Sequence, residues 1–311
     1  MVRVTDGFAP PLRDGVAASR VGVADGRFAT LLDFLAARFP AVADWPARLA
    51  RGDVLDADGR ALGADAPCAA GSLFWYWRDP PPEPRVPFDI ELLHQDEHLV
   101  VVDKPHFLPV IPGGRHLRET VLVRLRQRLG IATLAPMHRL DRETAGVLVF
   151  TVRADERAAY HALLRERDVH KVYEAIAPWR ADLALPLLAR HRLEKPEGRG
   201  FMQVQVADGE PNAEALVELV ERSDALALYR LTPRTGRTHQ LRVQMSALGV
   251  PIVGDRIYPT LWPEPAADAL PDWSNPLQLL AREIAFTDPV TGEARRFTSR
   301  RRLALTTGLP G

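Results

Sequence analysis

A proline-rich segment at 79–85 most constrains how this chain can fold. Four of its seven residues are proline. Proline fixes its own φ angle and has no amide hydrogen, so the segment fits neither a helix interior nor a central strand. We therefore predict a linker at 81–87 between a small domain at 1–80 and a larger domain at 88–311. A chain of 311 residues is long enough for both.

The composition excludes several classes of protein. The single cysteine, Cys68, leaves no internal disulfide framework and no metal site built from several cysteines. No apolar run approaches the roughly 18 residues that a membrane span needs. The first residues lack the basic region and apolar core of a secretory signal. We expect a cytoplasmic protein that has no membrane association.

The charge pattern suits a selective nucleic-acid partner. The formal net charge is zero, which argues against indiscriminate coating of nucleic acid. Among the 40 basic residues, only Lys104, Lys171 and Lys195 are lysine. Arginine makes planar, bidentate contacts with phosphate and stacks on bases, although GC-rich codon usage would produce the same bias. Local arginine clusters in a neutral protein fit recognition of a particular RNA shape.

The larger domain reads as a mixture of strands and helices. Buried-strand patterns occur at 98–102, 146–152, 171–177, 201–206 and 213–220. Amphipathic helices are predicted at 119–129 and 155–167, and the stretch 261–275 reads as a surface loop. The strands and helices do not alternate regularly, which disfavours a parallel Rossmann-type sheet. The predicted fold class is therefore α+β.

The small domain has two open interpretations. Helical spacing at 31–39, a helix end near 49–54 and a tight turn at 58–60 faintly resemble an S4-type RNA-binding module. The segment 1–80 nevertheless carries nine arginines and ten aspartates, whereas a module that grips RNA should present a basic face. Either a degenerate S4-like domain or a purely structural domain fits this pattern.

One segment, 137–146, carries the strongest chemical signal. It places Asp141 between Arg139 and Arg142, directly before the apolar run 147–150. A carboxylate held by cations beside a buried strand stays ionised and can act as a nucleophile. On charge pattern alone, a solvated cluster of surface ion pairs is the simpler interpretation.

A second segment, 235–243, carries arginines in an unusual place. Thr238 can cap a helix in which Leu241, Met245 and Leu248 form an apolar stripe. Arg242 would then lie in the first turn, where a cation opposes the helix dipole. Helix stability does not explain an arginine there, whereas a nearby anion would.

Four segments together resemble the RluA family of pseudouridine synthases. HRLDRETAG at 138–146 is similar to the family motif HRLDxxTSG and departs from it by Ala145, where serine is usual. The other three are GRTHQLR at 236–242, KVYEA at 171–175 and DKP at 103–105. The resemblance implies a catalytic domain with a central, largely antiparallel mixed sheet flanked by helices and crossed by a cleft.

The resemblance also implies roles for individual residues. The catalytic residues would be Asp141 as nucleophile, Arg242 as its partner, and Tyr173, against which the target base lies. The RNA-binding residues would be His138, Arg139, Arg142, Lys171, Arg237 and His239. No cofactor or metal is implied.

The implied activity is conversion of uridine to pseudouridine in structured RNA, either 23S ribosomal RNA or transfer RNA or both. The target uridine would be flipped out of its stack. The alternative is a catalytically silent RNA-binding protein or RNA chaperone with the same fold. We expect a monomer with no obligatory protein partner, since the implied site draws on one chain.

Overall fold

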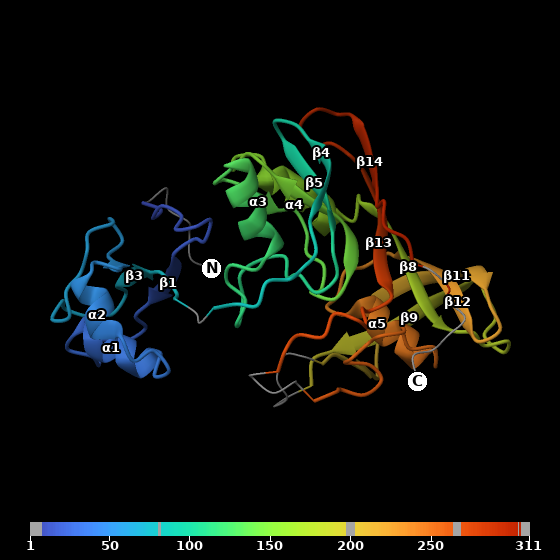
Figure 1. Cartoon of the computed structure of the whole chain (residues 1–311), viewed down its shortest axis with the longest axis horizontal. Coiled ribbons are helices and arrows are strands. Elements are labelled where there is room, and N and C mark those ends of the chain that lie inside the picture. Colours follow the sequence, from blue (N-terminus) through green and yellow to red (C-terminus); the bar gives the residue numbers. More distant parts are fainter. Residues whose placement is uncertain (1–7, 80–81, 197–202, 264–268, 304, 306–311) are drawn as a thin grey trace. The chain divides into compact units, whose positions relative to one another are not determined.

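The computed structural model describes residues 8–79, 82–196, 203–263, 269–303 and 305 (Figure 1). The chain divides into two compact units. The smaller unit contains Met1–Glu83 together with Pro112–Arg118 and Arg126–Ala132, and the larger unit contains the rest. Because two segments from the middle of the chain cluster with the smaller unit, the boundaries at 80 and 88 stay a prediction. Residues 80–81 of the proline-rich segment lie outside the described residues.

The smaller unit combines a short antiparallel sheet with two helices. The strands β1 (Ser19–Gly22), β2 (Val54–Leu55) and β3 (Leu73–Tyr76) pair in the order β1-β3-β2. The helices are α1 (Leu31–Arg38) and α2 (Trp45–Ala50). The Thr30 hydroxyl accepts the amide hydrogen of Asp33 and caps α1. Leu31, Leu35 and Trp45 form a separate core beside this sheet. The S4-like assignment stays a prediction.

In the larger unit, one mixed sheet dominates the described residues. Its strands are β4 (Glu91–Gln95), β5 (Leu99–Lys104), β6 (Ala135–Pro136), β7 (Ala145–Thr151), β8 (His170–Pro178), β9 (Leu187–Glu194), β10 (Gln205–Ala207), β11 (Ala213–Arg222), β12 (Leu226–Pro233), β13 (Leu279–Thr287) and β14 (Ala294–Thr298). The order is β10-β9-β11-β12-β8-β13-β7-β5-β4, with β14 beside β13 and β6 beside β7. The pairing of β13 with β7 is parallel and the other pairings are antiparallel. This sheet confirms the predicted α+β class.

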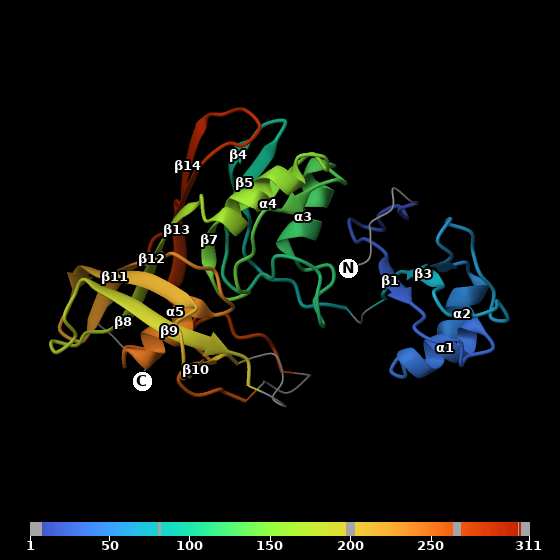
Figure 2. The ribbon, with the colours of Figure 1, turned by 180° about the vertical axis from the view of Figure 1, so that it is seen from behind.

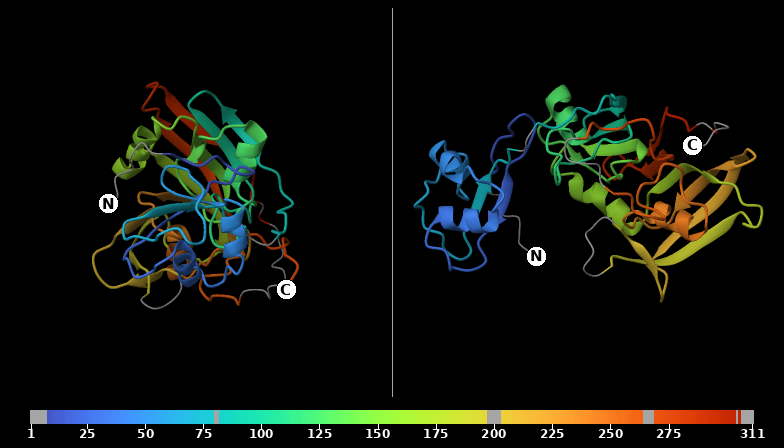
Figure 3. Two further views of the ribbon diagram at one scale, coloured as in Figure 1. Left: turned by 90° about the vertical axis from the view of Figure 1, so that its left-hand side faces the viewer. Right: turned by 60° about the horizontal axis from the view of Figure 1, so that its bottom comes forward.

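Helices pack on the sheet at two places. Helices α4 (Arg157–Glu166) and α5 (Gln240–Ala247) belong to the larger unit, together with the first half of α3 (Val121–Leu129), up to Leu125. Tyr160 of α4 lies in one buried cluster with Val147 and Val149 of β7. Helix α5 lies beside β9 and β10 (Figures 2 and 3). The helices predicted at 119–129 and 155–167 agree with α3 and α4 to within two residues at each end.

Strands that sequence patterns predicted are present, and others were missed. The predictions at 98–102, 146–152, 171–177 and 213–220 correspond to β5, β7, β8 and β11. The predicted strand at 201–206 partly falls on residues outside the described range, and β10 occupies Gln205–Ala207. Sequence patterns did not predict six strands of this sheet, namely β4, β6, β9, β12, β13 and β14. In the stretch 261–275, the described residues form neither helix nor strand, as predicted.

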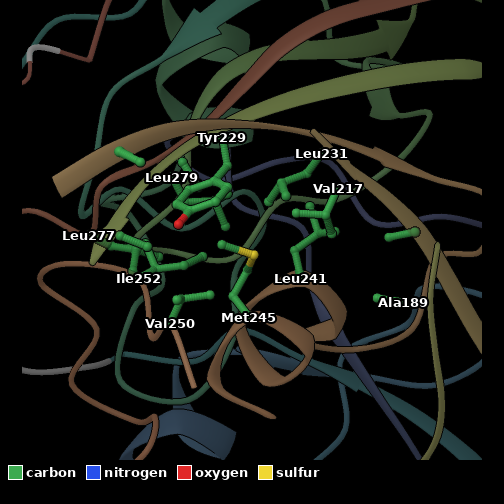
Figure 4. Packing of buried hydrophobic residues seen from close by; sticks show 14 residues of the cluster. Ala189, Val217, Tyr229, Leu231, Leu241, Met245, Val250, Ile252, Leu277 and Leu279 are labelled. Atoms are coloured by element: carbon green, nitrogen blue, oxygen red, sulfur yellow. The ribbon is translucent and has the colours of Figure 1, made fainter. Parts of the chain in front are cut away.

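The core next to α5 fixes the orientation of that helix. Leu241 and Met245 of α5 pack against Tyr229 and Leu231 of β12 (Figure 4). Full burial of such side chains contributes about 1.5–3 kcal/mol each. Leu248 packs at the margin of this cluster, so the predicted apolar stripe is confirmed. The packing holds α5 firmly and thereby the polar residues of its first turn.

Candidate active site

Asp141 lies in the loop that leads into β7. Its side chain is 30% exposed, while Thr144 and Ala145 just after it are buried. The amide of Thr144 donates to the carbonyl of Asp141 at 3.1 Å, which closes a turn. The carboxylate is therefore accessible to solvent and lies just before a strand whose residues are all buried.

Gly146 allows this loop to join the sheet closely. Its φ is +113°, a conformation that residues with a side chain rarely adopt. A Cβ atom at Gly146 would lie 2.2 Å from the carbonyl oxygen of Ala281 on β13. The glycine five residues after Asp141 is thus required where β7 meets β13.

Two side chains, those of Lys104 and His106, bind backbone carbonyls of this loop. The fully buried Lys104 donates its ammonium hydrogens to the carbonyls of Pro105 (3.0 Å), Leu108 (2.7 Å) and Arg142 (2.9 Å). Burial lowers the pKa of Lys104 to about 7, and three carbonyl acceptors favour its charged form.

His106 makes the second contact with the loop. Its Nδ1 lies 2.7 Å from the carbonyl oxygen of Glu143, which can only accept, so this nitrogen carries a hydrogen. Lys104 and His106 therefore fix the carbonyl groups of the two residues that follow Asp141.

Arg242 lies in the first turn of α5 and is 2% exposed. Its Nε and Nη2 donate to the two oxygens of Asp255 at 2.8 and 2.6 Å, and Nη1 lies 3.4 Å from Asp141 Oδ2. Burial alone would lower the pKa of Arg242, but the hydrogen bonds and charge of Asp255, with those of Asp141, raise it. A permanent cation thus faces Asp141.

Asp255 is itself fixed by the backbone. Its Oδ1 accepts the amide hydrogens of Ile257 (2.8 Å) and Tyr258 (3.1 Å). Sequence patterns gave no indication of a role for this carboxylate. The one sequence signal was the glycine directly before Asp255. In the structure, Gly254 has a φ of +75°, and a Cβ there would lie 2.4 Å from the carbonyl oxygen of Pro276. Such a glycine marks a tight turn directly before a polar residue.

The helix start differs from the prediction. His239, not Thr238, is the N-cap residue of α5, and its side chain forms no cap hydrogen bond. The side chain of Gln240 takes over, because its oxygen accepts hydrogens from the Thr235 hydroxyl (2.7 Å) and the Arg237 amide (3.1 Å). Threonine before a helix is a common cap signal, but here a glutamine side chain closes the turn instead.

His239 faces Asp141 rather than open solvent. Its Nε2 lies 3.9 Å from Asp141 Oδ1, and its Nδ1 lies 3.1 Å from the Tyr258 hydroxyl. Burial lowers the pKa of His239, which the nearby Asp141 only partly offsets. The RNA-binding role predicted for His239 stays a prediction.

Three further predicted site residues lie on β8 or beside it. Burial and then the charge of Asp141 raise the pKa of Tyr173, so its phenol stays protonated close to Asp141. A Cβ at Gly236 would lie 3.7 Å from Lys171 Nζ, and burial lowers the pKa of Lys171. His138 Nε2 accepts the Val149 amide hydrogen at 3.3 Å. Burial, then Lys171, lower the pKa of His138 to about 3, so it offers no positive charge near neutral pH.

The remaining three arginines are exposed. Arg142 pairs with Glu143 at 2.6 Å, and Arg237 Nε donates to the Asn212 carbonyl at 3.2 Å. Arg139 is exposed and makes no ion pair with any residue in the described ranges. The same ranges contain no cluster of three or more histidine, cysteine, aspartate or glutamate residues that could hold a metal ion.

Comparisons with known proteins agree on one family. A family model described as RNA pseudouridylate synthase matches residues 98–247. An uncharacterised RNA pseudouridine synthase of Synechocystis is 34% identical over 218 residues, which are 69% of this chain and 73% of that protein. The dual-specificity RNA pseudouridine synthase RluA of Haemophilus influenzae is 33% identical over 236 residues, which are 71% of this chain and 96% of that protein.

The fold is that of the pseudouridine synthases. Human RNA pseudouridylate synthase domain containing 1 superposes with a TM-score of 0.55 at 22% identity, over 71% of this chain and 86% of that chain. The chain belongs to the RNA pseudouridylate synthase family, and it is an isomerase that acts on RNA. Among the residues described, no helix is both long and apolar enough to cross a membrane.

Proposed function

We propose that this enzyme isomerises a specific uridine in structured ribosomal or transfer RNA, with Asp141 as the nucleophile. The observation that carries the proposal is the buried Arg242, which is held by Asp255 and directs its remaining nitrogen toward the partly exposed Asp141. A carboxylate that faces a fixed cation stays ionised without losing access to a substrate.

The reaction breaks the bond between ribose and base, turns the base, and rejoins it to the ribose through carbon. The ring carbon that bonds to ribose releases its hydrogen as a proton, and the ring nitrogen that separates from ribose gains a proton. Asp141 attacks either the anomeric carbon or the uracil ring. Both routes begin from the negatively charged carboxylate of Asp141. Arg242 stabilises charge that changes during the reaction, an effect worth about 2.7–4 kcal/mol for one preorganised donor.

The substrate must enter as an extruded base, because a stacked uridine does not expose its atoms. The flat ring of Tyr173 supplies a stacking surface, which is worth about 1–3 kcal/mol per base. The proposal assigns Arg139, which is exposed and makes no ion pair in the described ranges, to fill the gap that the base leaves. His138, Arg142, Lys171, Arg237 and His239 are the proposed RNA contacts. We expect a cytoplasmic monomer that needs no cofactor.

Pseudouridine mapping tests this proposal. Total RNA is compared from cells with the gene, without it, and complemented by wild type or by Asp141→Asn. A site that is lost on deletion and restored only by wild type supports the proposal and identifies the RNA. If Asp141→Asn also restores the pseudouridine, Asp141 is not the nucleophile. A change confined to RNAs other than ribosomal and transfer RNA would contradict the substrate class.

A further inference from the structure

We propose that Tyr258 is a positioning residue that fixes His239 as the tautomer with hydrogen on Nε2, directed at Asp141. Asp141 is then held between one fixed cation, Arg242, and one fixed neutral donor, His239. The inference rests on the proposed function in that it takes Asp141 as the nucleophile, and it assigns His239 a role toward Asp141 in addition to RNA contact.

The hydrogen bonds of Tyr258 define the tautomer. The Val204 amide lies 2.8 Å from the Tyr258 hydroxyl and can only donate, so the hydroxyl oxygen accepts there. The hydroxyl hydrogen is left for another acceptor, and His239 Nδ1 lies 3.1 Å away. No other acceptor for this hydroxyl is found in the described ranges. Nδ1 therefore accepts, and the ring hydrogen of a neutral imidazole lies on Nε2.

The ring is held in this position by its backbone as well. His239 has a φ of +51°, a left-handed conformation that non-glycine residues adopt at a cost of about 1–3 kcal/mol. The strain is sustained by Leu241 and Met245, which anchor the helix that follows. Strain of this kind, in a residue whose ring faces a reactive carboxylate, points to orientation rather than to helix capping.

One short segment supports both partners of Asp141. Asp255 Oδ1 accepts from Arg242 Nη2 and from the Tyr258 amide. The guanidinium of Arg242 also lies 5.6 Å from the centroid of the Tyr258 ring. The turn at 255–258 therefore orients the cation through a carboxylate and the imidazole through a phenol.

A neutral donor and a second cation would act differently on Asp141. The charged and titratable groups that face His239 are Asp141, Arg242, Asp255, Lys195 and Tyr258. Arg242 is one cation shared by Asp141 and Asp255, and a charged imidazole would add a second cation that weakens the nucleophilicity of Asp141. Burial raises the pKa of Tyr258, which keeps its hydroxyl hydrogen available for His239.

Nitrogen NMR of the histidine rings tests the tautomer directly and needs no RNA. The full-length protein is labelled with ¹⁵N in its nine histidines, and His239→Ala identifies the His239 signals. We expect an unprotonated Nδ1 and a protonated Nε2 at neutral pH in wild type, and a mixture of tautomers in Tyr258→Phe. A protonated Nδ1 in wild type, alone or with a protonated Nε2, would overturn the proposal.

Kinetics test whether Tyr258 acts through His239. Tyr258→Phe should lower the single-turnover rate at saturating enzyme by about 10–100-fold, as for other residues that orient a reactive group, with RNA affinity unchanged within about twofold. The same substitution should have no further effect in a His239→Ala background. Equal effects in both backgrounds would show that Tyr258 does not act through His239.

A matched variant separates this effect from a loss of stability. Tyr229→Phe also removes a buried phenol hydroxyl, which donates to the Pro178 carbonyl at 2.8 Å in the core. It should lower the melting temperature without changing the single-turnover rate. If wild type forms no pseudouridine on any RNA, the proposed function fails, whereas the NMR result still decides the tautomer.

Discussion

At the scale of single residues, Arg242 joins an exposed reactive group to a buried structural one. It bridges Asp141 and Asp255, and only Asp141 is accessible to solvent. Removing one partner of a buried ion pair leaves an uncompensated charge, which typically costs about 3–5 kcal/mol. Stability and catalysis are therefore linked at this residue and have to be measured separately.

Arg242→Ala should lower the single-turnover rate of pseudouridine formation by about 10²–10³-fold, because a preorganised charge next to Asp141 is lost. The double variant Arg242→Met with Asp255→Asn removes both charges of the buried pair. It should recover much of the stability lost in Arg242→Ala but none of the rate. Rate measurements at saturating enzyme, together with urea unfolding, check both parts. If the double variant regains the wild-type rate, Arg242 does not contribute to catalysis.

Gly146 gives a prediction of a different kind, since no side chain is lost. Gly146→Ala should destabilise the protein by about 3 kcal/mol or more, because it combines a φ of +113° with a 2.2 Å approach to Ala281. Gly130→Ala is the matched control, with a φ of +70° and nothing within 4 Å of the added Cβ. It should cost only about 1 kcal/mol. Equal losses in urea unfolding would mean that the contact with Ala281 is relieved at little cost.

The residues within the motifs were predictable from the sequence, whereas the residues that hold them in place were not. Asp141, Tyr173 and Arg242 stand in segments that resemble a known family, and the structure gathers them, although their catalytic roles stay predictions. Asp255 and Tyr258 lie outside those segments. Their contacts depend on how the chain turns after α5, and no periodicity in the sequence reports that turn.

At the scale of secondary-structure elements, strands with strong local patterns were predictable. β5 begins with four apolar residues in a row and β7 contains six, and both strands are buried throughout, as expected for strands covered on both faces. β13 was missed because its position depends on a parallel pairing with β7, more than 130 residues earlier in the chain. β9 alternates arginine with apolar residues at only some positions, so its pattern is too irregular to distinguish from a loop.

One contact between elements should depend on pH. His98, directly before β5, donates from Nδ1 to Glu156, directly before α4, at 2.9 Å. This hydrogen bond raises the pKa of His98 above its usual value of 6.5, against the opposing effect of burial. Its stabilisation is fully present below about pH 6.5 and is lost as the pH rises through the higher pKa of the folded state.

His98→Gln should therefore be less stable than wild type by about 0.5–1 kcal/mol near pH 6, and the difference should shrink near pH 8. Urea unfolding of both proteins at the two pH values measures this. The comparison removes the contribution of the other histidines, which titrate in both proteins. A difference that does not change with pH would mean that His98 is not charged in the folded state.

At the scale of the whole molecule, the parts that support the candidate site come from one region of the sequence. The hydrogen bonds and ion pairs given above for Asp141, Arg242, Asp255 and His239 all come from residues 141–258, and Lys104 and His106 add supports from 104–108. The family match at 98–247 covers nearly the same range. The described residues of the segment 1–80 form a core of their own and make none of the contacts given above.

Removing residues 1–80 should therefore leave the single-turnover rate at saturating enzyme within about threefold of wild type. Arg13, Arg48 and Arg51 of this segment already pair with aspartates of the same segment. Its nine arginines are also outnumbered by ten aspartates, so the segment offers no net positive charge to phosphate. The slope of log affinity against log salt should then change by less than roughly one, which is about the contribution of a single phosphate contact. Filter binding over a range of salt concentrations measures that slope. A larger decrease in this slope would mean that the small domain binds RNA. A slower rate at saturating enzyme would mean that the small domain contributes to the reaction itself. Circular dichroism of the shortened chain distinguishes either result from loss of folding.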